Sequence, residues 1–254
     1  MNMVLGELSS SNFTHPISVY PEVGEMLYSL ARNLRPRIVI EIGSFIGYSA
    51  ICFAQAIEDN KQAEGKVYSI DNFLPHYNNP NLPMDIINPL ELATSNVERA
   101  GLQHRITFLK GFSYDLASEL IPKIQYIDLL FIDGDHTYKG VLTDYNLFHF
   151  KVRKGGLIIF HDIYPKNCGY WGPRIIIDTL KRGFFKKHYD ILELETSEGF
   201  GLAICKKLTD RKIGIKDNFI LETFRKATAF LKEGESLKKG IGYYINSLKS
   251  ENQE

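Results

Sequence analysis

The sequence predicts an α/β protein with a doubly wound sheet of seven strands, parallel except for a C-terminal antiparallel hairpin, and with helices on both faces. Two observations support this prediction. Short apolar runs with the composition of buried strands recur along the first two thirds of the chain, and the intervals between them are long enough for helices. Strands that alternate with helices form right-handed βαβ units and therefore a largely parallel sheet.

Five of these runs are expected to be the parallel strands. They are apolar and β-branched at consecutive positions, as strands buried on both faces are. They span 37–42, 66–70, 106–109, 127–132 and 156–160. Two further candidates, 189–194 and 200–206, are joined by the short Ser197–Gly199 connection, which predicts an antiparallel hairpin.

Helix-compatible segments occupy the intervals between the predicted strands. They cover 48–58, 88–100, 113–120 and 138–151, with further helices at 19–33 and 174–182. Near the C-terminus, two segments on either side of Gly234 each place apolar residues on one helical face, namely Ile220, Phe224, Ala227 and Leu231, then Leu237, Ile241, Tyr244 and Leu248. The chain is therefore expected to consist of an N-terminal helical extension (1–34), a sheet-containing core (35–207) and C-terminal amphipathic helices (208–254).

The composition excludes several classes of protein. The 254 residues contain 30 Lys and Arg against 30 Asp and Glu, whereas a general nucleic-acid binder needs a basic surplus. The three scattered cysteines form no CxxC motif, so neither a disulfide framework nor a structural zinc site is expected. Neither a secretory signal nor an apolar run of about 18 residues is found. We expect a cytoplasmic protein without nucleic-acid or membrane partners, and the amphipathic tail is compatible with a homodimer.

A glycine-containing turn, EIGSFIGYS (41–49), follows the first predicted strand. Such a turn lets a ligand approach the backbone and the free N–H groups of the next helix. It contains two glycines where the dinucleotide fingerprint has three, and Glu41 precedes them, which suits an ammonium group better than a pyrophosphate. Asp71 ends the second strand, where a carboxylate typically binds ribose hydroxyls. Together they predict a site for a nucleoside that carries an amino acid; the alternative is an ordinary turn with a capping acid.

These motifs resemble those of class I S-adenosylmethionine-dependent methyltransferases, which have a Rossmann-like fold. EIGSFIGYSA (41–50) is similar to the first motif of small-molecule O-methyltransferases, particularly the catechol O-methyltransferase type. FIDGDHTYKGVLTDY (131–145) and KGGLIIFHDI (154–163) resemble the bacterial methyltransferase-24 family. The likeness covers about 38–207. It implies that 35–207 is a methyltransferase core and that S-adenosylmethionine is the cofactor.

The resemblance implies roles for individual cofactor-binding residues. Glu41 would face the methionine end of the cofactor, with the backbone of Gly43 and the side chain of Asp133 close by. Asp71 would bind the ribose hydroxyls, helped by Asn72. The methionine portion would be lined by Phe45, Tyr48 and Ser49, and the adenine by Gly111, Ser113 and Tyr114. Phe45 and Tyr48 could equally be core aromatics.

Acidic and imidazole side chains follow the fourth and fifth predicted strands, in Asp133-Gly134-Asp135-His136 and His161-Asp162. The carboxyl ends of neighbouring strands face the same crevice at the switch point of an open α/β sheet, so these groups are expected to converge. Two carboxylates and an imidazole can bind a divalent ion. Such an ion would hold an acceptor hydroxyl and lower its pKa.

The catechol-type pattern implies Asp133, His161 and Asp162 as the metal ligands. His161 departs from that pattern, which has a carboxylate there; Mg²⁺ therefore fits less well than Mn²⁺, Fe²⁺ or Zn²⁺, and Asp135 is an alternative ligand. His136 falls where these enzymes carry a basic residue, and an imidazole that is neutral near pH 7 is suited to accept the hydroxyl proton. His136 and Asp133 are thus the candidate catalytic residues.

The sequence predicts O-methylation of a small hydroxylated molecule, and it leaves two other functions open. An NAD(P)-dependent oxidoreductase would need the third glycine that the first turn lacks. A non-catalytic cofactor-binding protein would use its tail for assembly. No motif identifies the acceptor, and nitrogen and carbon acceptors remain open, although a metal site favours oxygen. The loops at 72–86 and 161–173, the second with Tyr170 and Trp171, are expected to overhang the crevice.

Overall fold

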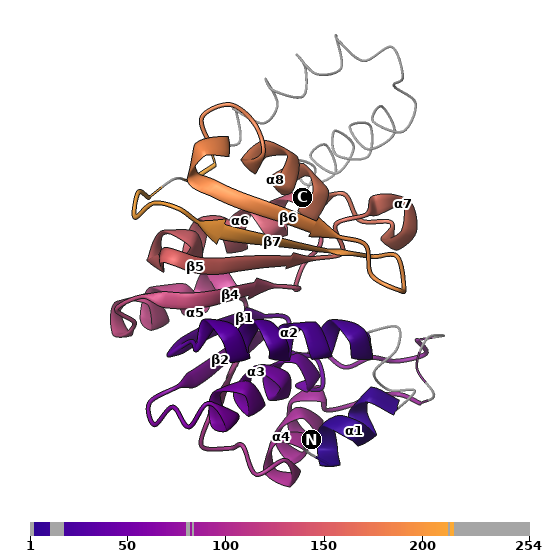
Figure 1. The fold of residues 1–254 in the computed structure, drawn as a ribbon. Coiled ribbons are helices and arrows are strands. Elements are labelled where there is room, and N and C mark those ends of the chain that lie inside the picture. Colours follow the sequence, from indigo (N-terminus) through magenta and orange to yellow (C-terminus); the bar gives the residue numbers. More distant parts are fainter. Residues whose placement is uncertain (1–2, 11–17, 80–81, 83, 213, 216–254) are drawn as a thin grey trace.

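The computed structural model describes residues 3–10, 18–79, 82, 84–212, 214 and 215. Within them lies a seven-stranded sheet with the strand order β3-β2-β1-β4-β5-β7-β6 (Figure 1). The first five strands run parallel, and β7 pairs antiparallel with both β5 and β6. The strands are β1 (Ile38–Ile42), β2 (Lys66–Asp71), β3 (Ile106–Lys110), β4 (Ile127–Ile132), β5 (Val152–His161), β6 (Tyr189–Leu194) and β7 (Leu202–Lys207). The predicted fold class is therefore confirmed.

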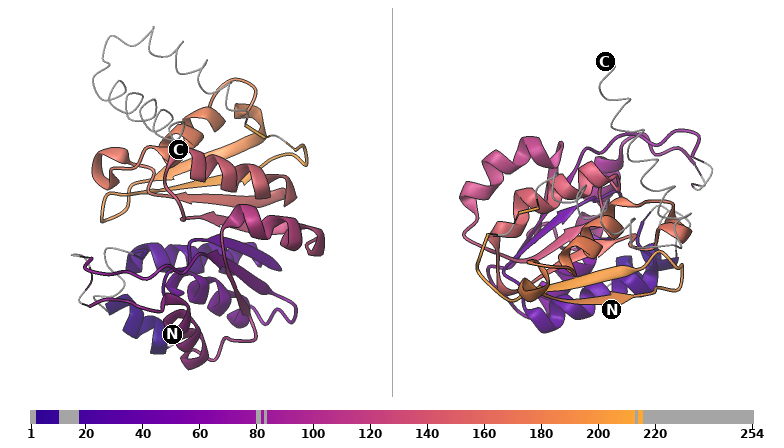
Figure 2. Two further views of the ribbon diagram at one scale, coloured as in Figure 1. Left: turned by 180° about the vertical axis from the view of Figure 1, so that it is seen from behind. Right: turned by 90° about the horizontal axis from the view of Figure 1, so that it is seen from above.

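Helices cover both faces of this twisted sheet (Figure 2). The helices are α1 (Met3–Ser10), α2 (Pro21–Leu34), α3 (Tyr48–Asp59), α4 (Pro89–Arg99), α5 (Ser113–Leu120), α6 (Tyr138–Phe148), α7 (Pro165–Cys168) and α8 (Gly172–Leu180), with short 3-10 helices η1 (Ile121–Lys123), η2 (His149–Lys151) and η3 (Lys186–His188). The side chains of α1 to α4 share one apolar core with the sheet, and those of α5, α6 and α8 share the other. The predicted C-terminal helices lie outside the described residues.

Local sequence signals explain where several helices begin. Pro21 and Pro89 occupy the first turns of α2 and α4, where proline loses no hydrogen bond. The side chain of Asn88 caps α4 and that of Thr137 caps α6, where Thr137 accepts the N–H of Gly140 at 3.0 Å. None of the helices in the described part of the chain is long and apolar enough to cross a bilayer.

The structure differs from the sequence prediction in where β5 and β7 begin. β5 begins at Val152 rather than at Gly156, because the chain continues pairing with β4 through a register shift at the glycine pair. Gly155 adopts φ +80° there, a conformation that glycine accommodates. β7 begins at Leu202 rather than at Phe200, so the hairpin connection spans 195–201 and is longer than the tight turn predicted from Ser197–Gly199.

Asp128 joins three strands at their amino ends, opposite the candidate site. Its Oδ2 accepts the backbone N–H groups of Arg37 (2.8 Å) and Ile38 (3.0 Å), and its Oδ1 accepts Nε of Arg153 in an ion pair. The carboxylate is 3% exposed, so these bonds replace its lost hydration. This one side chain thus fixes the register between β1, β4 and β5.

Replacing Asp128 by Ala is expected to lower the free energy of unfolding by about 2–4 kcal/mol, because two backbone donors and a guanidinium lose their shared acceptor. Asp128→Asn should lose less, since its carbonyl oxygen can still accept both N–H groups. Guanidinium unfolding of the two variants and the wild type measures the difference. Equal stability of the three proteins would contradict this account.

Candidate functional site

The turn after β1 brings the carboxyl ends of β1 and β4 into contact. Gly43 adopts φ +96°, and a Cβ at this position would overlap the backbone carbonyl oxygen of Asp133. Gly43 N donates to Ile70 O at 2.9 Å, and Asp133 N donates to Ile42 O at 2.8 Å. Gly43 is therefore required by the packing of the strands, and this packing places Asp133 beside the end of β1.

Glu41 is fully buried next to this turn. Its Oε2 accepts the hydroxyl of Ser69, while its Oε1 is buried without a hydrogen-bond partner of good geometry among the described residues. Burial raises the pKa of Glu41 to about 8, helped by the charges of Asp133 and Asp71 and opposed by the hydroxyls of Ser49 and Ser69. The carboxyl group therefore has one unused acceptor and would be stabilised in its ionised form by a cation.

Asp71, at the end of β2, is already engaged by the backbone. Its Oδ2 accepts the N–H groups of Ser44 (2.7 Å) and Phe45 (2.9 Å), and its Oδ1 accepts that of Phe73 (2.7 Å). A carboxylate offers about four acceptor positions, so one remains for a ligand hydroxyl. Asp71 thus organises the glycine turn, and its ribose-binding role stays a prediction.

The residues predicted to surround the adenine differ in their exposure. Ser113 is buried at the start of α5 and its hydroxyl donates to Asp144, a contact that the sequence did not predict. Burial raises the pKa of Asp144 to about 6. Tyr114 is 56% exposed and stacks on Phe112, with ring centroids 5.2 Å apart. Gly111, just after β3, precedes this pair and has φ +149°. Because both rings are exposed, they form an open aromatic surface.

The residues predicted to line the methionine portion lie in different surroundings. Phe45 has φ +45°. Its ring meets that of His76 edge-on, with the two ring centroids 5.1 Å apart. Tyr48 is 2% exposed and its ring packs against Gly24 of α2, so its side chain lies in the core. Ser49 lies near Glu41, and Asn72 uses its Oδ1 to accept the N–H of Leu74 at 3.1 Å.

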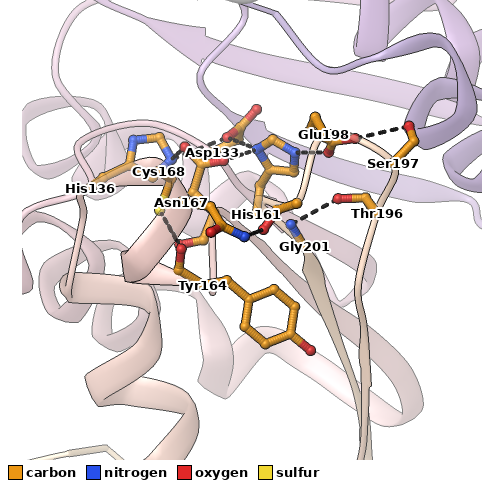
Figure 3. A network of polar contacts seen from close by, with 12 residues as sticks. Asp133, His136, His161, Tyr164, Asn167, Cys168, Thr196, Ser197, Glu198 and Gly201 are labelled. Atoms are coloured by element: carbon orange, nitrogen blue, oxygen red, sulfur yellow. Dashed lines mark hydrogen bonds and ion pairs between the residues drawn. The ribbon is translucent and has the colours of Figure 1, made fainter.

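Four side chains that follow β4 and β5 form a compact cluster. Figure 3 shows three of them, Asp133, His136 and His161. Each of Asp133, His136, His161 and Asp162 offers one ligand atom, and these atoms lie within 4.8 Å of one another. Nδ1 of His161 is 3.0 Å from Oδ1 of Asp133 and 3.0 Å from Oδ1 of Asp162. Nε2 of His136 is 3.3 Å from Oδ1 of Asp133 and 3.3 Å from Oδ2 of Asp162. The predicted convergence of the two strand ends is therefore observed.

The charges in this cluster depend on one another. Burial opposes ionisation of Asp133, but the charge of His161 and the hydrogen bonds from His136 and His161 hold the pKa of Asp133 well below its usual value. Burial also lowers the pKa of His136, but the hydrogen bond to Asp133 and the charges of Asp133 and Asp162 outweigh it, and that pKa is raised. The pKa of His161 is raised for the same reason. The two carboxylates thus favour the protonated forms of both imidazoles.

The spacing of these atoms fits a divalent ion. Two ligand atoms about 2.1 Å from one ion lie about 3.0–3.4 Å apart at angles between 90° and 109°, and the contacts above fall in this range. Asp162 has φ +57°, an uncommon conformation for a residue other than glycine, which aims its carboxylate at His161 and His136. Asp135, the alternative ligand, instead accepts Thr137 N and Thr137 Oγ1, both at 2.9 Å, at the start of α6.

Two neighbours of the cluster come from the surrounding loops. The ring of Tyr170 stacks on that of His136 with centroids 5.0 Å apart. Glu198, in the β6–β7 connection, has a side chain that is 1% exposed, and its Oε1 is 3.9 Å from Nε2 of His161. From the sequence, Glu198 is expected only as part of a turn. The signal that could have identified it is the pairing of β7 with β5, which brings this turn to the strand end that carries His161.

The strand order is that of the Rossmann-like fold found in class I S-adenosylmethionine-dependent methyltransferases. The sequence profile of a family described as a methyltransferase domain matches residues 40–163. The match covers just under half of the chain, and over these residues the chain is similar to that family.

Similar proteins include several O-methyltransferases. A caffeoyl-CoA O-methyltransferase from Stellaria longipes is 26% identical over 78% of this chain and 74% of its own length. A catechol O-methyltransferase from Niastella koreensis is 26% identical over 58% of each chain. The structure of a putative O-methyltransferase from Klebsiella pneumoniae has a TM-score of 0.65 at 20% identity, over 82% of this chain and 91% of that one. The chain spans about half the length of some curated relatives and three quarters of others.

Gly43→Ala is expected to lower the free energy of unfolding by about 2–5 kcal/mol, because the new Cβ adds an overlap with the Asp133 carbonyl to the strain of a positive φ. Gly101→Ala is the matched control, since Gly101 also has a positive φ (+71°) but its surroundings in the described structure are open. Chemical unfolding of both variants separates the overlap from the backbone strain. A loss for Gly43→Ala no greater than that for Gly101→Ala would contradict the packing role.

Proposed function

We propose that this protein transfers a methyl group from S-adenosylmethionine to a hydroxyl of a small molecule, with the help of a divalent metal ion. The observation that carries the proposal is the convergence of Asp133, His136, His161 and Asp162 next to the buried Glu41, in a core similar to the methyltransferase family. The O-methyltransferases among the relatives support an oxygen acceptor.

The cofactor-binding part of the proposal rests on Glu41 and Asp71. The unpaired Oε1 of Glu41 fits the α-ammonium group of a methionine moiety, which would satisfy a buried acceptor. The remaining acceptor position of Asp71 fits a ribose hydroxyl, and the open Phe112–Tyr114 surface fits the face of an adenine ring. These three groups lie at the ends of β1, β2 and β3, which are adjacent in the sheet.

The metal-binding part rests on Asp133, His161 and Asp162. An ion bound there would supply Lewis acidity that lowers the pKa of the acceptor hydroxyl and fixes its position. An imidazole in the ligand set favours Mn²⁺, Fe²⁺ or Zn²⁺ over Mg²⁺, which prefers oxygen ligands. Two carboxylates and a neutral imidazole balance the two charges of the ion, whereas three carboxylates would leave the site with a net negative charge.

His136 is the proposed general base once a bound divalent ion has offset the charges of Asp133 and Asp162 and left its imidazole neutral, and its Nε2 is the atom that accepts the proton. The stacking of Tyr170 holds the plane of the imidazole, and the two carboxylates at 3.3 Å stabilise the imidazolium that forms. The acceptor oxygen forms the new C–O bond as the C–S bond of the sulfonium breaks. The electron pair of that bond stays on sulfur, which yields S-adenosylhomocysteine, and the hydroxyl proton goes to His136.

Two other functions compete with this proposal. An NAD(P)-dependent oxidoreductase is disfavoured by the missing third glycine and by Glu41, whose carboxylate would repel a pyrophosphate. A non-catalytic cofactor-binding protein would not need the metal cluster. Binding of NAD in place of S-adenosylmethionine would support the first, and cofactor binding without turnover of any acceptor would support the second.

The direct test is transfer of a labelled methyl group to a panel of hydroxylated small molecules, with and without added Mn²⁺ and a chelator. We expect His136→Gln to lower kcat about 10²–10⁴-fold through loss of the base, with unchanged affinity for S-adenosylmethionine and for the ion. His104→Gln, at an exposed histidine paired with Glu58, is the control. Full activity in chelator would contradict the metal role, and weaker ion binding by His136→Gln would make His136 a ligand.

The buried Glu41 predicts a pH dependence of cofactor binding. Its pKa of about 8 means that the free protein holds a proton below that pH, whereas pairing with an ammonium group requires the carboxylate. Binding should therefore release a proton, and affinity should rise close to tenfold between pH 6 and pH 7. Calorimetry in buffers of different ionisation enthalpy measures both effects. Glu41→Gln should bind more weakly with no such proton release, and a wild-type affinity that is flat with pH would exclude this pairing.

A further inference from the structure

The connection between β6 and β7 reaches over the end of the strand that carries His161. His161 is paired with Leu202 at the start of β7, and Leu202 is paired with Leu194 at the end of β6. The residues between Leu194 and Leu202 therefore extend past the carboxyl end of β5. Glu198 lies in the middle of this connection, within reach of the metal cluster (Figure 3).

The connection is held in place by hydrogen bonds within itself and to the segment after β5. Within it, Gly201 N donates to Thr196 Oγ1 at 2.8 Å. Two bonds come from the segment after β5: Tyr164 N donates to Phe200 O at 2.9 Å, and Asn167 Nδ2 donates to the carbonyl oxygen of Gly199 at 2.6 Å. The backbone on both sides of Glu198 is thus fixed relative to His161.

Glu198 and His161 present two buried polar atoms to each other. The side chain of Glu198 is 1% exposed and that of His161 is 6% exposed. Oε1 of Glu198 and Nε2 of His161 both lack a hydrogen-bond partner within the described chain, and they are 3.9 Å apart. A buried carboxylate oxygen left unpaired is costly. A shift of about 1 Å would bring the two atoms to hydrogen-bond distance.

The other nitrogen of the same ring faces the metal cluster. Nδ1 of His161 is 3.0 Å from both Asp133 and Asp162, and Nε2 points away from them toward Glu198. An imidazole that binds a metal ion is neutral and carries its proton on only one nitrogen. If that proton were on Nδ1, the Nε2 lone pair would face the carboxylate of Glu198 and repel it. The buried carboxylate therefore favours the tautomer with the proton on Nε2 and the lone pair on Nδ1.

We propose that Glu198 is a positioning residue for the metal site, whose carboxylate accepts the Nε2–H of His161 and directs the Nδ1 lone pair at the ion. This inference rests on the proposed divalent-metal site and adds a residue from the hairpin to it. A carboxylate behind a metal-binding histidine fixes the orientation of the ring and increases the basicity of its ligand nitrogen. His161 stands where the catechol-type pattern has a carboxylate. The carboxylate of Glu198 behind this imidazole would restore the negative charge that the histidine lacks.

The test is the binding of Mn²⁺ and of Zn²⁺ to the full-length protein, measured by calorimetry without cofactor or acceptor. Glu198→Ala is expected to weaken binding about 10–100-fold. Glu198→Gln keeps the size of the side chain and an oxygen acceptor, so its loss should be smaller. Glu195→Gln is the matched control, because Glu195 is an exposed carboxylate on the same connection and should leave affinity unchanged.

A second measurement separates positioning from a structural role of the hairpin. In the Zn²⁺-loaded wild type, long-range ¹H–¹⁵N spectra should show His161 with its proton on Nε2. The d–d absorption of the Co²⁺-loaded protein should change in Glu198→Ala and less in Glu198→Gln, with the unfolding temperature of the metal-free Gln variant close to wild type.

The outcomes distinguish this inference from the proposed function. A wild type that binds neither ion overturns the metal site and this inference together. A wild type that binds an ion with the affinity of Glu198→Ala, or with the His161 proton on Nδ1, overturns the role of Glu198 and leaves the metal site standing. Weakened binding in Glu198→Ala with partial recovery in Glu198→Gln supports both.

Discussion

The close approach of the ends of β1 and β4 is the constraint on which the site depends. Only a residue without a Cβ fits at position 43 against the carbonyl of Asp133. This contact sets the distance between the buried carboxyl group of Glu41 on β1 and the partly buried carboxylate of Asp133 just after β4. Their mutual repulsion helps to raise the pKa of Glu41, so a packing requirement of the backbone also sets the electrostatics of the crevice.

The site concentrates acidic groups in a chain that is neutral as a whole. Asp133 and Asp162 are balanced locally by His136 and His161, whose protonation they favour. An arriving cation would compete with these protons, as it must wherever ligands have to be deprotonated. The same field is suited to a sulfonium and an ammonium group. Neutral composition therefore hides a local charge balance that can be altered by binding or by pH.

The sequence predicted the fold and the positions of most site residues because both follow from strand ends. Apolar runs located the parallel strands, and Asp133, His161 and Asp162 converge since β4 and β5 are neighbours. Side-chain directions within helices were not predictable: Tyr48 turns toward Gly24 of α2, and the hydroxyl of Ser113 is bound by Asp144. Glu198 was missed because its position depends on pairing between β5 and β7, which hydropathy does not encode. The roles of these residues in binding and catalysis stay predictions.

The insertion of β7 between β5 and β6 has a consequence for the order of folding. β6 comes before β7 in the chain, but its partner in the sheet is β7. During synthesis β6 therefore has no strand to join until β7 has left the ribosome. The parallel part of the sheet can assemble earlier, whereas the connection that carries Glu198 reaches His161 only when β7 docks. The cluster at the strand ends is thus completed in the last step of sheet assembly, and a chain cut short just before β7 would retain Glu198 without the strand pairing that brings its carboxylate to His161.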